Sequence, residues 1–361
     1  MVRRSRGRVV EIESTEELDR RLAAGARSLT GWHLRSVDLT QHSEQLARLR
    51  VAGALFLGCD FTEDDELAVR KRGGIVFPAV PDVPVDTYRT ALYTADELYG
   101  SGSYGEALDA RVYAWSRLPS DPERALAKAL HDHAIDEALA DWTEGRSLVG
   151  VMGGHATERD QPGYTEAVRL GHLLAQDATV ATGGGPGAME AANLGAWLSG
   201  RDVDEIDEAV AMLAEVPSFR PSVGAWARAA FAVLEKWPDG VDSLGIPTWH
   251  YGHEPPNAFA SAIAKYFHNA TREAILLQEC DAGIVFLPGA GGTVQEIFQD
   301  ACENYYADPS AVAPMVLVGR AHWTEDVPAW PLLEKLARGR PMEGHVHLVD
   351  TVEEAAAVVA G

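Results

Sequence analysis

The segment at residues 283–296 limits what this chain can fold into more than any other part of the sequence. An apolar run at 283–287 breaks into a glycine-rich turn at 288–292, and an amphipathic helix pattern follows the turn. A buried strand, a glycine turn and a helix N-terminus in this order form an anion site, because backbone N–H groups and the helix dipole converge there. Glu296 lies one turn into the helix, so the pattern predicts chemistry on a phosphorylated small molecule.

The same segment also fits a purely structural interpretation. Residues 293–296 read Thr-Val-Gln-Glu, a capping box in which Thr293 and Glu296 only satisfy backbone N–H groups. A capping box needs the threonine and the glutamate but not the glycines that precede them. The glycines therefore favour a bound anion, and the two interpretations are compatible.

Length and charge limit the function classes that fit. The chain has 361 residues, which is enough for two domains. A formal net charge of −23 argues against partners with a nucleic-acid backbone or an anionic membrane surface, although a local loop can still bind a small anion. No apolar stretch has the length of a membrane span or follows the pattern of a signal peptide. The three cysteines have no disulfide or metal-site spacing, so we expect a cytoplasmic protein.

Strand and helix patterns divide the chain into three predicted parts. Residues 1–85 read as a small N-terminal α/β domain; two similar phrases in it, 33–40 and 54–62, are too few copies to define a solenoid. Residues 86–146 read as a helical connector. Residues 147–361 read as a Rossmann-like, doubly wound parallel α/β domain with a helical insertion at 197–242.

Individual elements follow from the same patterns. The expected strands are 9–12, 52–57, 74–77, 148–152, 179–182, 243–248, 283–287, 315–318 and 345–349. One long helix is expected at 258–278.

A second glycine turn follows the strand expected at 179–182. Residues 183–188 fit G-x-G-x-x-A, the dinucleotide fingerprint, and the turn opens a helix. The acid that would bind the NAD ribose should come about 20 residues later, where Asp202 and Asp204 lie in a polar stretch rather than at a strand end. NAD binding is therefore disfavoured, and an NAD-dependent enzyme is a third-ranked alternative.

Taken together, the two turns resemble the Lonely Guy (LOG) family, whose members were long mislabelled lysine decarboxylases. In that family a GGG turn leading to a glycine and a methionine is followed later by PGGxGTxxE. This chain has TGGGPGAMEAAN at 182–193 and PGAGGTVQE at 288–296. The resemblance covers residues 147–361 and implies a Rossmann-like fold that is usually dimeric.

The resemblance also implies an activity and a site. The activity is hydrolysis of the N-glycosidic bond of a nucleoside 5′-monophosphate, of AMP or cytokinin type, to free base and ribose 5-phosphate. The implied catalytic pair is Arg272, within Thr-Arg-Glu at 271–273, and Glu296. The implied substrate-binding residues are Gly153, Gly183, Gly184, Gly185, Gly187, Met189, Gly289, Ala290, Gly291, Gly292 and Thr293. The expected partners are the nucleotide and a second copy of the chain, as a homodimer or a higher homo-oligomer, with no metal and no organic cofactor.

Departures from the family pattern leave an alternative open. Ala290 replaces the second glycine of PGGxGT, which requires a negative φ at Ala290, and Gly291 is expected to take over the unusual dihedral. The insertion and the N-terminal parts make a non-catalytic nucleotide sensor of the same fold the alternative, since fold alone does not settle function. His345 and His347 share one face of a strand but lack a further metal ligand. The sequence does not specify the nucleobase.

Overall fold

The computed structural model describes residues 9–100, 102–250 and 254–361. The chain forms two compact units, Met1–Thr90 with Pro119–Ala134, and Ala91–Leu118 with Ile135–Gly361. The predicted helical connector, 86–146, is therefore divided between the two units. Among the described residues, no helix is both long and apolar enough to cross a lipid bilayer.

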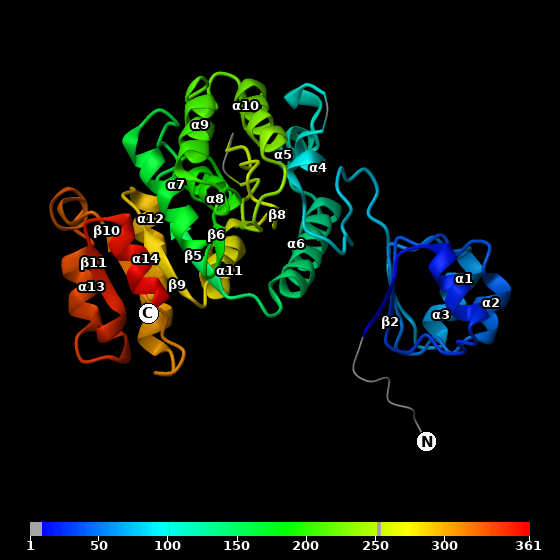
Figure 1. Cartoon of the computed structure of the whole chain (residues 1–361). Coiled ribbons are helices and arrows are strands. Elements are labelled where there is room, and N and C mark those ends of the chain that lie inside the picture. The colour runs from blue at the N-terminus through cyan, green and yellow to red at the C-terminus, as the bar shows by residue number, and fades with distance from the viewer. Residues whose placement is uncertain (1–8, 101, 251–253) are drawn as a thin grey trace. The chain divides into compact units, whose positions relative to one another are not determined.

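The first unit contains a four-stranded parallel sheet in which the strands follow one another in chain order. Its strand β2 and its helices α1, α2 and α3 are labelled in Figure 1. Its elements are β1 (Val10–Ile12), α1 (Thr15–Ala23), β2 (Trp32–Arg35), α2 (Ser43–Arg48), β3 (Leu55–Leu57), α3 (Glu63–Lys71) and β4 (Ile75–Phe77). The register pairs Ile12 with Leu34, Leu34 with Phe56, and Phe56 with Val76, and these four buried side chains form a ladder in the core.

This sheet corrects the expectation that there are too few repeats for a solenoid. Equivalent positions lie about 22 residues apart, which is a period typical of solenoid repeats with one strand and one helix each. Asp38 bridges Asp60, so the phrases 33–40 and 54–62 occupy equivalent places in neighbouring repeats. The β2 strand and α2, which sequence patterns did not predict, complete the second repeat.

The second unit is built on a seven-stranded parallel sheet, which confirms the predicted doubly wound fold. The strand order is β11-β10-β9-β5-β6-β7-β8. The strands are β5 (Leu148–Met152), β6 (Thr179–Thr182), β7 (Leu244–Gly245), β8 (Ala262–Ile263), β9 (Gly283–Phe286), β10 (Met315–Val318) and β11 (Val346–Val349). The chain runs outward from β5 to β8 and then returns to place β9 on the other side of β5. The crevice between the carboxyl ends of β5 and β9 is thus the topological switch point, where such sheets bind ligands.

Helices cover both faces of this sheet (Figure 1). One group packs together and comprises α7 (Pro162–Leu174), α8 (Ala188–Trp197) and α14 (Val352–Ala360). The other comprises α11 (Asn269–Glu279), α12 (Gly291–Tyr306) and α13 (Trp330–Ala337). The remaining helices are α4 (Ala95–Tyr99), η1 (Tyr104–Glu106), α5 (Leu108–Ser116), α6 (Pro122–Thr143), α9 (Val203–Ala214), α10 (Val223–Lys236), η2 (His322–Asp326) and η3 (Pro341–His345).

The prediction of one helix at 258–278 is wrong for its first half. Residues 262–263 form the edge strand β8, and α11 begins only at Asn269. The reason is that almost every side chain from 258 to 267 is buried, so the apolar run has no periodicity that separates a helix from a strand. As a consequence, Lys265 lies on extended chain rather than on a helix.

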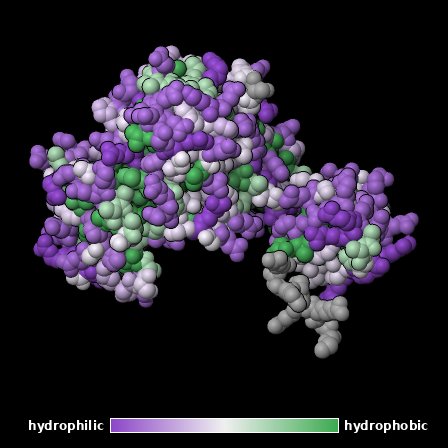
Figure 2. Space-filling view, in the orientation of Figure 1, coloured by the Kyte–Doolittle hydropathy of each residue, from purple (hydrophilic) through white to green (hydrophobic). Residues whose placement is uncertain are grey.

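The visible face of the molecule is mostly hydrophilic, with hydrophobic residues in small separate groups (Figure 2). This agrees with the formal net charge of −23. Scattered apolar residues of this kind are normal for a protein surface.

Candidate functional site

The N-terminus of α12 is open at the switch point. The helix begins at Gly291 after the N-cap residue Ala290, whose side chain makes no capping bond, and Thr293 lies inside the first turn. The capping-box interpretation is therefore wrong. Among the described residues, the backbone N–H groups of Gly291, Gly292 and Thr293 donate no hydrogen bond, and the first helical bond runs from Val294 to Ala290. Three unused donors at a helix N-terminus can bind an anion.

The loop accommodates alanine at position 290 without strain. Ala290 has φ −118° and ψ −145°, so the negative φ that an alanine requires is present. Gly291 does not have a positive φ, and the expectation that it takes over an unusual dihedral is wrong. The loop needs its glycine at 289, because a Cβ there would overlap Oγ1 of Thr293.

The turn after β5 lies directly beside this loop. A Cβ on Gly154 would lie 3.5 Å from the carbonyl oxygen of Pro288 and 4.0 Å from Cα of Gly289. A Cβ on Gly153 would lie 3.1 Å from Cβ of Leu287. Gly153 thus allows the chain after β5 to pack tightly against Leu287, and Gly154 lies in van der Waals contact with Pro288.

Arg272 on α11 and Glu296 on α12 lie close enough for their charges to interact. The Arg272 side chain is 8% exposed, and its Nε has no hydrogen-bond partner. Burial raises the pKa of Glu296 to about 7; the Arg272 guanidinium opposes this increase and the Glu273 carboxylate adds to it. The two side chains form no direct ion pair among the described residues, so each has hydrogen-bonding capacity for a ligand.

Glu273 holds the two helices of this pair together. Its carboxylate accepts hydrogen bonds from the side-chain amides of Asn269 at 2.6 Å and of Gln295 at 2.6 Å. This link fixes the neighbours of Arg272 and Glu296 in place. The structure therefore places the two predicted catalytic residues near each other, with Glu296 on the same helix as Gly291, Gly292 and Thr293.

The first glycine turn, 183–187, is buried and packed against the protein. Gly184 has φ +69° and lies against Pro247, and Gly187 has φ +76° and lies against Gly154. The N–H of Gly184 donates to Oγ1 of Thr182, and the carbonyl of Gly184 accepts from the N–H of Asn257. The N–H of Gly184 is thus used within the protein, and Gly184 and Gly187 allow backbones to approach closely.

Three other residues of this region border the crevice. A Cβ on Gly183 would lie 2.8 Å from Sδ of Met189 and 3.7 Å from Nη1 of Arg272. A Cβ on Gly185 would lie 3.0 Å from Cε of Met189 and 4.0 Å from Oε2 of Glu254. Met189 therefore covers the turn, and Gly185 lies at its boundary with Glu254.

His322 was not predicted as a site residue. It follows β10, and its Nε2 lies 3.0 Å from the carbonyl oxygen of Gly289 and 3.3 Å from the amide nitrogen of Gly289. The imidazole thus holds the loop through either group, depending on its tautomer. The signal that points to it in the sequence is its place just after a strand next to β9.

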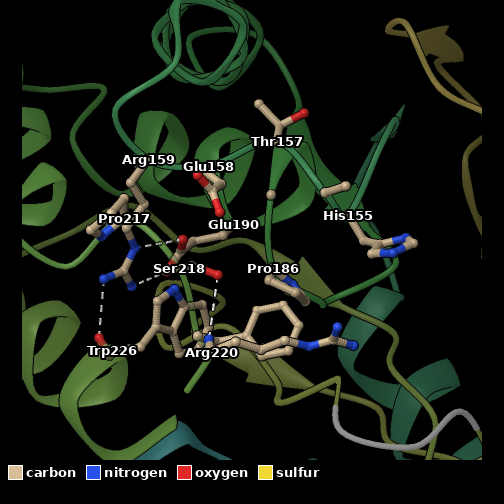
Figure 3. Close-up of a pocket in the computed structure, with 13 residues that line it drawn as sticks. His155, Thr157, Glu158, Arg159, Pro186, Glu190, Pro217, Ser218, Arg220 and Trp226 are labelled. Atoms are coloured by element: carbon tan, nitrogen blue, oxygen red, sulfur yellow. Dashed lines mark hydrogen bonds and ion pairs between the residues drawn. The ribbon is translucent and has the colours of Figure 1, made fainter. Parts of the chain in front are cut away.

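A cavity of about 200 Å³ lies beside the turn after β5 (Figure 3). Its inner wall is a buried ion pair in which Arg159 donates to Glu190 at 2.9 Å and 2.5 Å. Arg159 also donates to the backbone carbonyls of Val216 and Trp226 and stacks on the Trp226 ring. Four of the five N–H groups of Arg159 therefore have acceptors, and this pair connects the insertion to α8.

Asp300, one turn beyond Glu296, supports a prediction on stability. Its Oδ2 is buried without a partner, and burial raises the pKa of Asp300 to about 8. A carboxyl with a raised pKa stabilises the fold in its neutral form, and this contribution is lost as the pH rises from about 4 to 8. We expect Asp300→Asn to raise the free energy of unfolding at pH 8.5 by about 1–2 kcal/mol, with little change at pH 4.

Urea denaturation at the two pH values measures this effect. Asp308→Asn is the matched control, because that carboxylate is exposed and accepts bonds from Ser310, which lower its pKa. The control should not gain stability at pH 8.5. Equal stability of Asp300→Asn and the native chain at both pH values would contradict a buried, unpartnered carboxylate.

Comparisons with known proteins show little sequence similarity. No protein-family model matches the chain, and no curated protein matches it. Two solved structures match 60% of this chain over 96% of their own length. They are the molybdenum cofactor binding protein from the phototrophic bacterium Rippkaea orientalis, with 17% identity and a TM-score of 0.38, and the molybdenum cofactor carrier protein from Chlamydomonas reinhardtii, with 19% identity and a TM-score of 0.36. The resemblance to the LOG family therefore stays a prediction based on the two motifs.

Proposed function

We propose that this chain hydrolyses the N-glycosidic bond of a nucleoside 5′-monophosphate to free base and ribose 5-phosphate. The observation that carries the proposal is the juxtaposition at the switch point of three unused N–H groups, a buried Arg272 and a partly buried Glu296. The first group fits a phosphate, and the pair fits a sugar that develops positive charge. The resemblance to the LOG family implies the same reaction.

The phosphate would bind at the N-terminus of α12. Its oxygens accept from Gly291, Gly292 and Thr293, and the helix dipole adds a favourable field. The ribose then extends over Gly153 and Gly185 toward the turn after β6. Met189 and Gly183 contact each other below this position and exclude water from one side.

The chemical step needs stabilisation of an oxocarbenium-like ribose. Water attacks C1′ as the C1′–N bond breaks; C1′ gains an oxygen, and a proton passes to the base nitrogen. The Glu296 carboxylate stabilises the positive charge and orients the water. The Arg272 guanidinium has a free Nε with which to neutralise phosphate or hold a ribose hydroxyl.

A panel of nucleoside 5′-monophosphates, with the matching nucleosides and diphosphates, tests this function. Chromatography follows free base, and we expect base from at least one monophosphate and none from its nucleoside, because the nucleoside lacks the anchoring phosphate. Measurable nucleotide binding without base from any member would support the non-catalytic sensor instead.

The pH dependence of kcat/KM is a further prediction. Because the ionised form of Glu296 acts and its pKa is raised to about 7, kcat/KM should rise about tenfold per pH unit below pH 7 and level off above it. In the Arg272→Gln variant this rise of kcat/KM should occur at higher pH, because the guanidinium lowers the pKa of Glu296 in the native chain.

Comparing the pH profiles of the native chain and of Arg272→Gln also distinguishes titration of the enzyme from titration of the substrate. The second ionisation of a phosphate has a pKa of about 6 and does not respond to Arg272→Gln. If kcat/KM rises around pH 6, and identically in the native chain and in Arg272→Gln, Glu296 is excluded as the titrating group.

A further inference from the structure

A second cavity, of about 230 Å³, opens beside Glu254 and is not used by the proposed phosphate and ribose sites. Its walls include three aromatic side chains, Tyr104, Tyr113 and Trp249, and its polar lining residues are Asp109, Glu254 and Lys265. Pockets for whole ligands of drug size measure roughly 300–1,000 Å³, so this volume suits one planar ring system of a larger ligand.

The polar floor of this cavity is a buried ion pair. Nζ of Lys265 donates to Oδ1 of Asp109 at 2.5 Å, and the two side chains are 1% and 3% exposed. The same carboxylate accepts from Nε1 of Trp249 at 2.8 Å and from the hydroxyl of Tyr104 at 2.8 Å. Asp109 is therefore nearly saturated, whereas the Lys265 ammonium, with Asp109 its one acceptor among the described residues, keeps two N–H groups for a ligand.

Glu254 joins this cavity to the proposed catalytic crevice. Its Oε2 lies 4.0 Å from the position of a Cβ on Gly185, and its Oε1 lies 3.9 Å from Nδ1 of His155, which follows the turn after β5. The Glu254 side chain is partly exposed, and its carboxylate makes no hydrogen bond to another described residue. Glu254 is therefore an available acceptor at the point where the crevice meets the cavity.

We propose that this cavity is the nucleobase subsite and that it selects guanine over adenine; this inference rests on the proposed function. The aromatic rings of Tyr104 and Tyr113 in the walls suit contact with a planar base, whereas the Trp249 ring packs on Phe267 and lies under Nζ of Lys265. Lys265 can only donate and Glu254 can only accept.

Guanine matches this donor and acceptor pair more completely than adenine does. Guanine carries two adjacent acceptors, O6 and N7, for the ammonium of Lys265, and two adjacent donors, N1–H and the 2-amino group, for the carboxylate of Glu254. Adenine has an amino donor at position 6, next to N7 and N1, and no donor at position 2. Adenine therefore offers each of the two residues one bond at most, where guanine offers each residue two.

The cavity of Figure 3 is less suited to a base. Its buried charges, Arg159 and Glu190, satisfy each other in a bidentate pair. A base there would meet a polar wall in which Arg159 keeps one N–H group, whereas Lys265 keeps two in its own cavity.

Isothermal titration calorimetry of the full chain with GMP, AMP and ribose 5-phosphate tests the subsite. All proteins carry Glu296→Gln so that no nucleotide is cleaved during the titration. We expect the Kd of GMP to be at least about tenfold lower than that of AMP. In Glu254→Ala, and in the double variant Asp109→Asn with Lys265→Met, this ratio should fall below about threefold, while the Kd of ribose 5-phosphate stays unchanged.

The double variant removes both charges together, so no buried charge is left unpaired. If it does not fold, Glu254→Ala decides, because that side chain is partly exposed. Glu106→Ala is the matched control: this exposed carboxylate bonds to Ser103 outside the cavity, and the variant should keep full discrimination. Equal affinities for GMP and AMP in the Glu296→Gln protein, or discrimination that survives in the folded variants, would overturn the subsite.

These outcomes are independent of catalysis. Discrimination in binding without base release by the native chain would overturn the proposed hydrolysis but keep the subsite. Base release from GMP and AMP at equal kcat/KM, with equal affinities, would overturn the subsite but keep the proposed hydrolysis.

Discussion

Replacing Gly195 with alanine is expected to lower the free energy of unfolding of the larger unit by about 3 kcal/mol or more. Gly195 lies on α8, where a Cβ would overlap the carbonyl oxygen of Val168 and lie 2.7 Å from the amide nitrogen of His172, both on α7. Because these are backbone atoms, no rotamer change relieves the overlap, and the helices must separate. Gly171 on α7 makes the reciprocal approach to Ala192.

This separation would also disturb the site. The turn before α8 carries Gly185 and Gly187, and Gly187 packs on Gly154 in the turn after β5. Urea denaturation followed by circular dichroism measures the effect. Gly200→Ala is the control, because nothing lies within 4 Å of a Cβ at that exposed position. An equally small loss in both variants would contradict the glycine-mediated contact of α7 and α8.

Replacing Glu296 with glutamine is expected to lower kcat about a thousandfold. Glutamine keeps the size of the side chain but cannot carry the negative charge that the proposed oxocarbenium-like state requires. The Kd of the nucleotide should change by less than about threefold, because the phosphate is held by the N–H groups of α12. Single-turnover base release and calorimetry separate the two effects.

Glu303→Gln is the matched control for this variant. Glu303 lies on the same helix about two turns farther from the loop, and burial raises its pKa as well. Its variant should retain the native kcat. If Glu296→Gln turns over like the native chain, Glu296 has no role in the step; if Glu303→Gln is equally inactive, a general loss of helix structure explains both.

The larger sheet could be predicted from the sequence because most of its strands are short apolar runs, and β5, β6 and β10 are each followed directly by a glycine. The strands that sequence patterns missed or misplaced have particular reasons. In β2, both Trp32 and His33 are partly exposed, so its four residues lack a clear apolar run. At β8, burial on all sides removed the periodicity that separates strand from helix.

The site could be predicted in part, for a physical reason. Short motifs indicate the local backbone conformation, so the open N–H groups of α12 could be predicted from Gly289, Gly291 and Gly292. The burial of Gly184 depends on Asn257, which lies far along the chain. The ion pair of Asp109 and Lys265 joins residues 156 positions apart, and no local pattern contains both.

The pairing of Arg272 with Glu296 could be predicted only in part. The family resemblance predicts the pair, and the structure places the two charges close enough to interact, without testing their roles. No sequence motif contains His322, and its contact with Gly289 depends on the adjacency of β10 and β9 in the sheet. Contacts between distant segments, rather than local propensity, therefore limit what a single sequence reveals of a site.

The most direct test of the central claim is the stoichiometry of products from one nucleoside 5′-monophosphate that binds the chain. Chromatography should find free base and ribose 5-phosphate in a one-to-one ratio with the native chain. Neither product should exceed the background rate with Glu296→Gln. Tight binding of the nucleotide with no base and no ribose 5-phosphate after prolonged incubation would contradict the claim and leave a protein that only binds nucleotides.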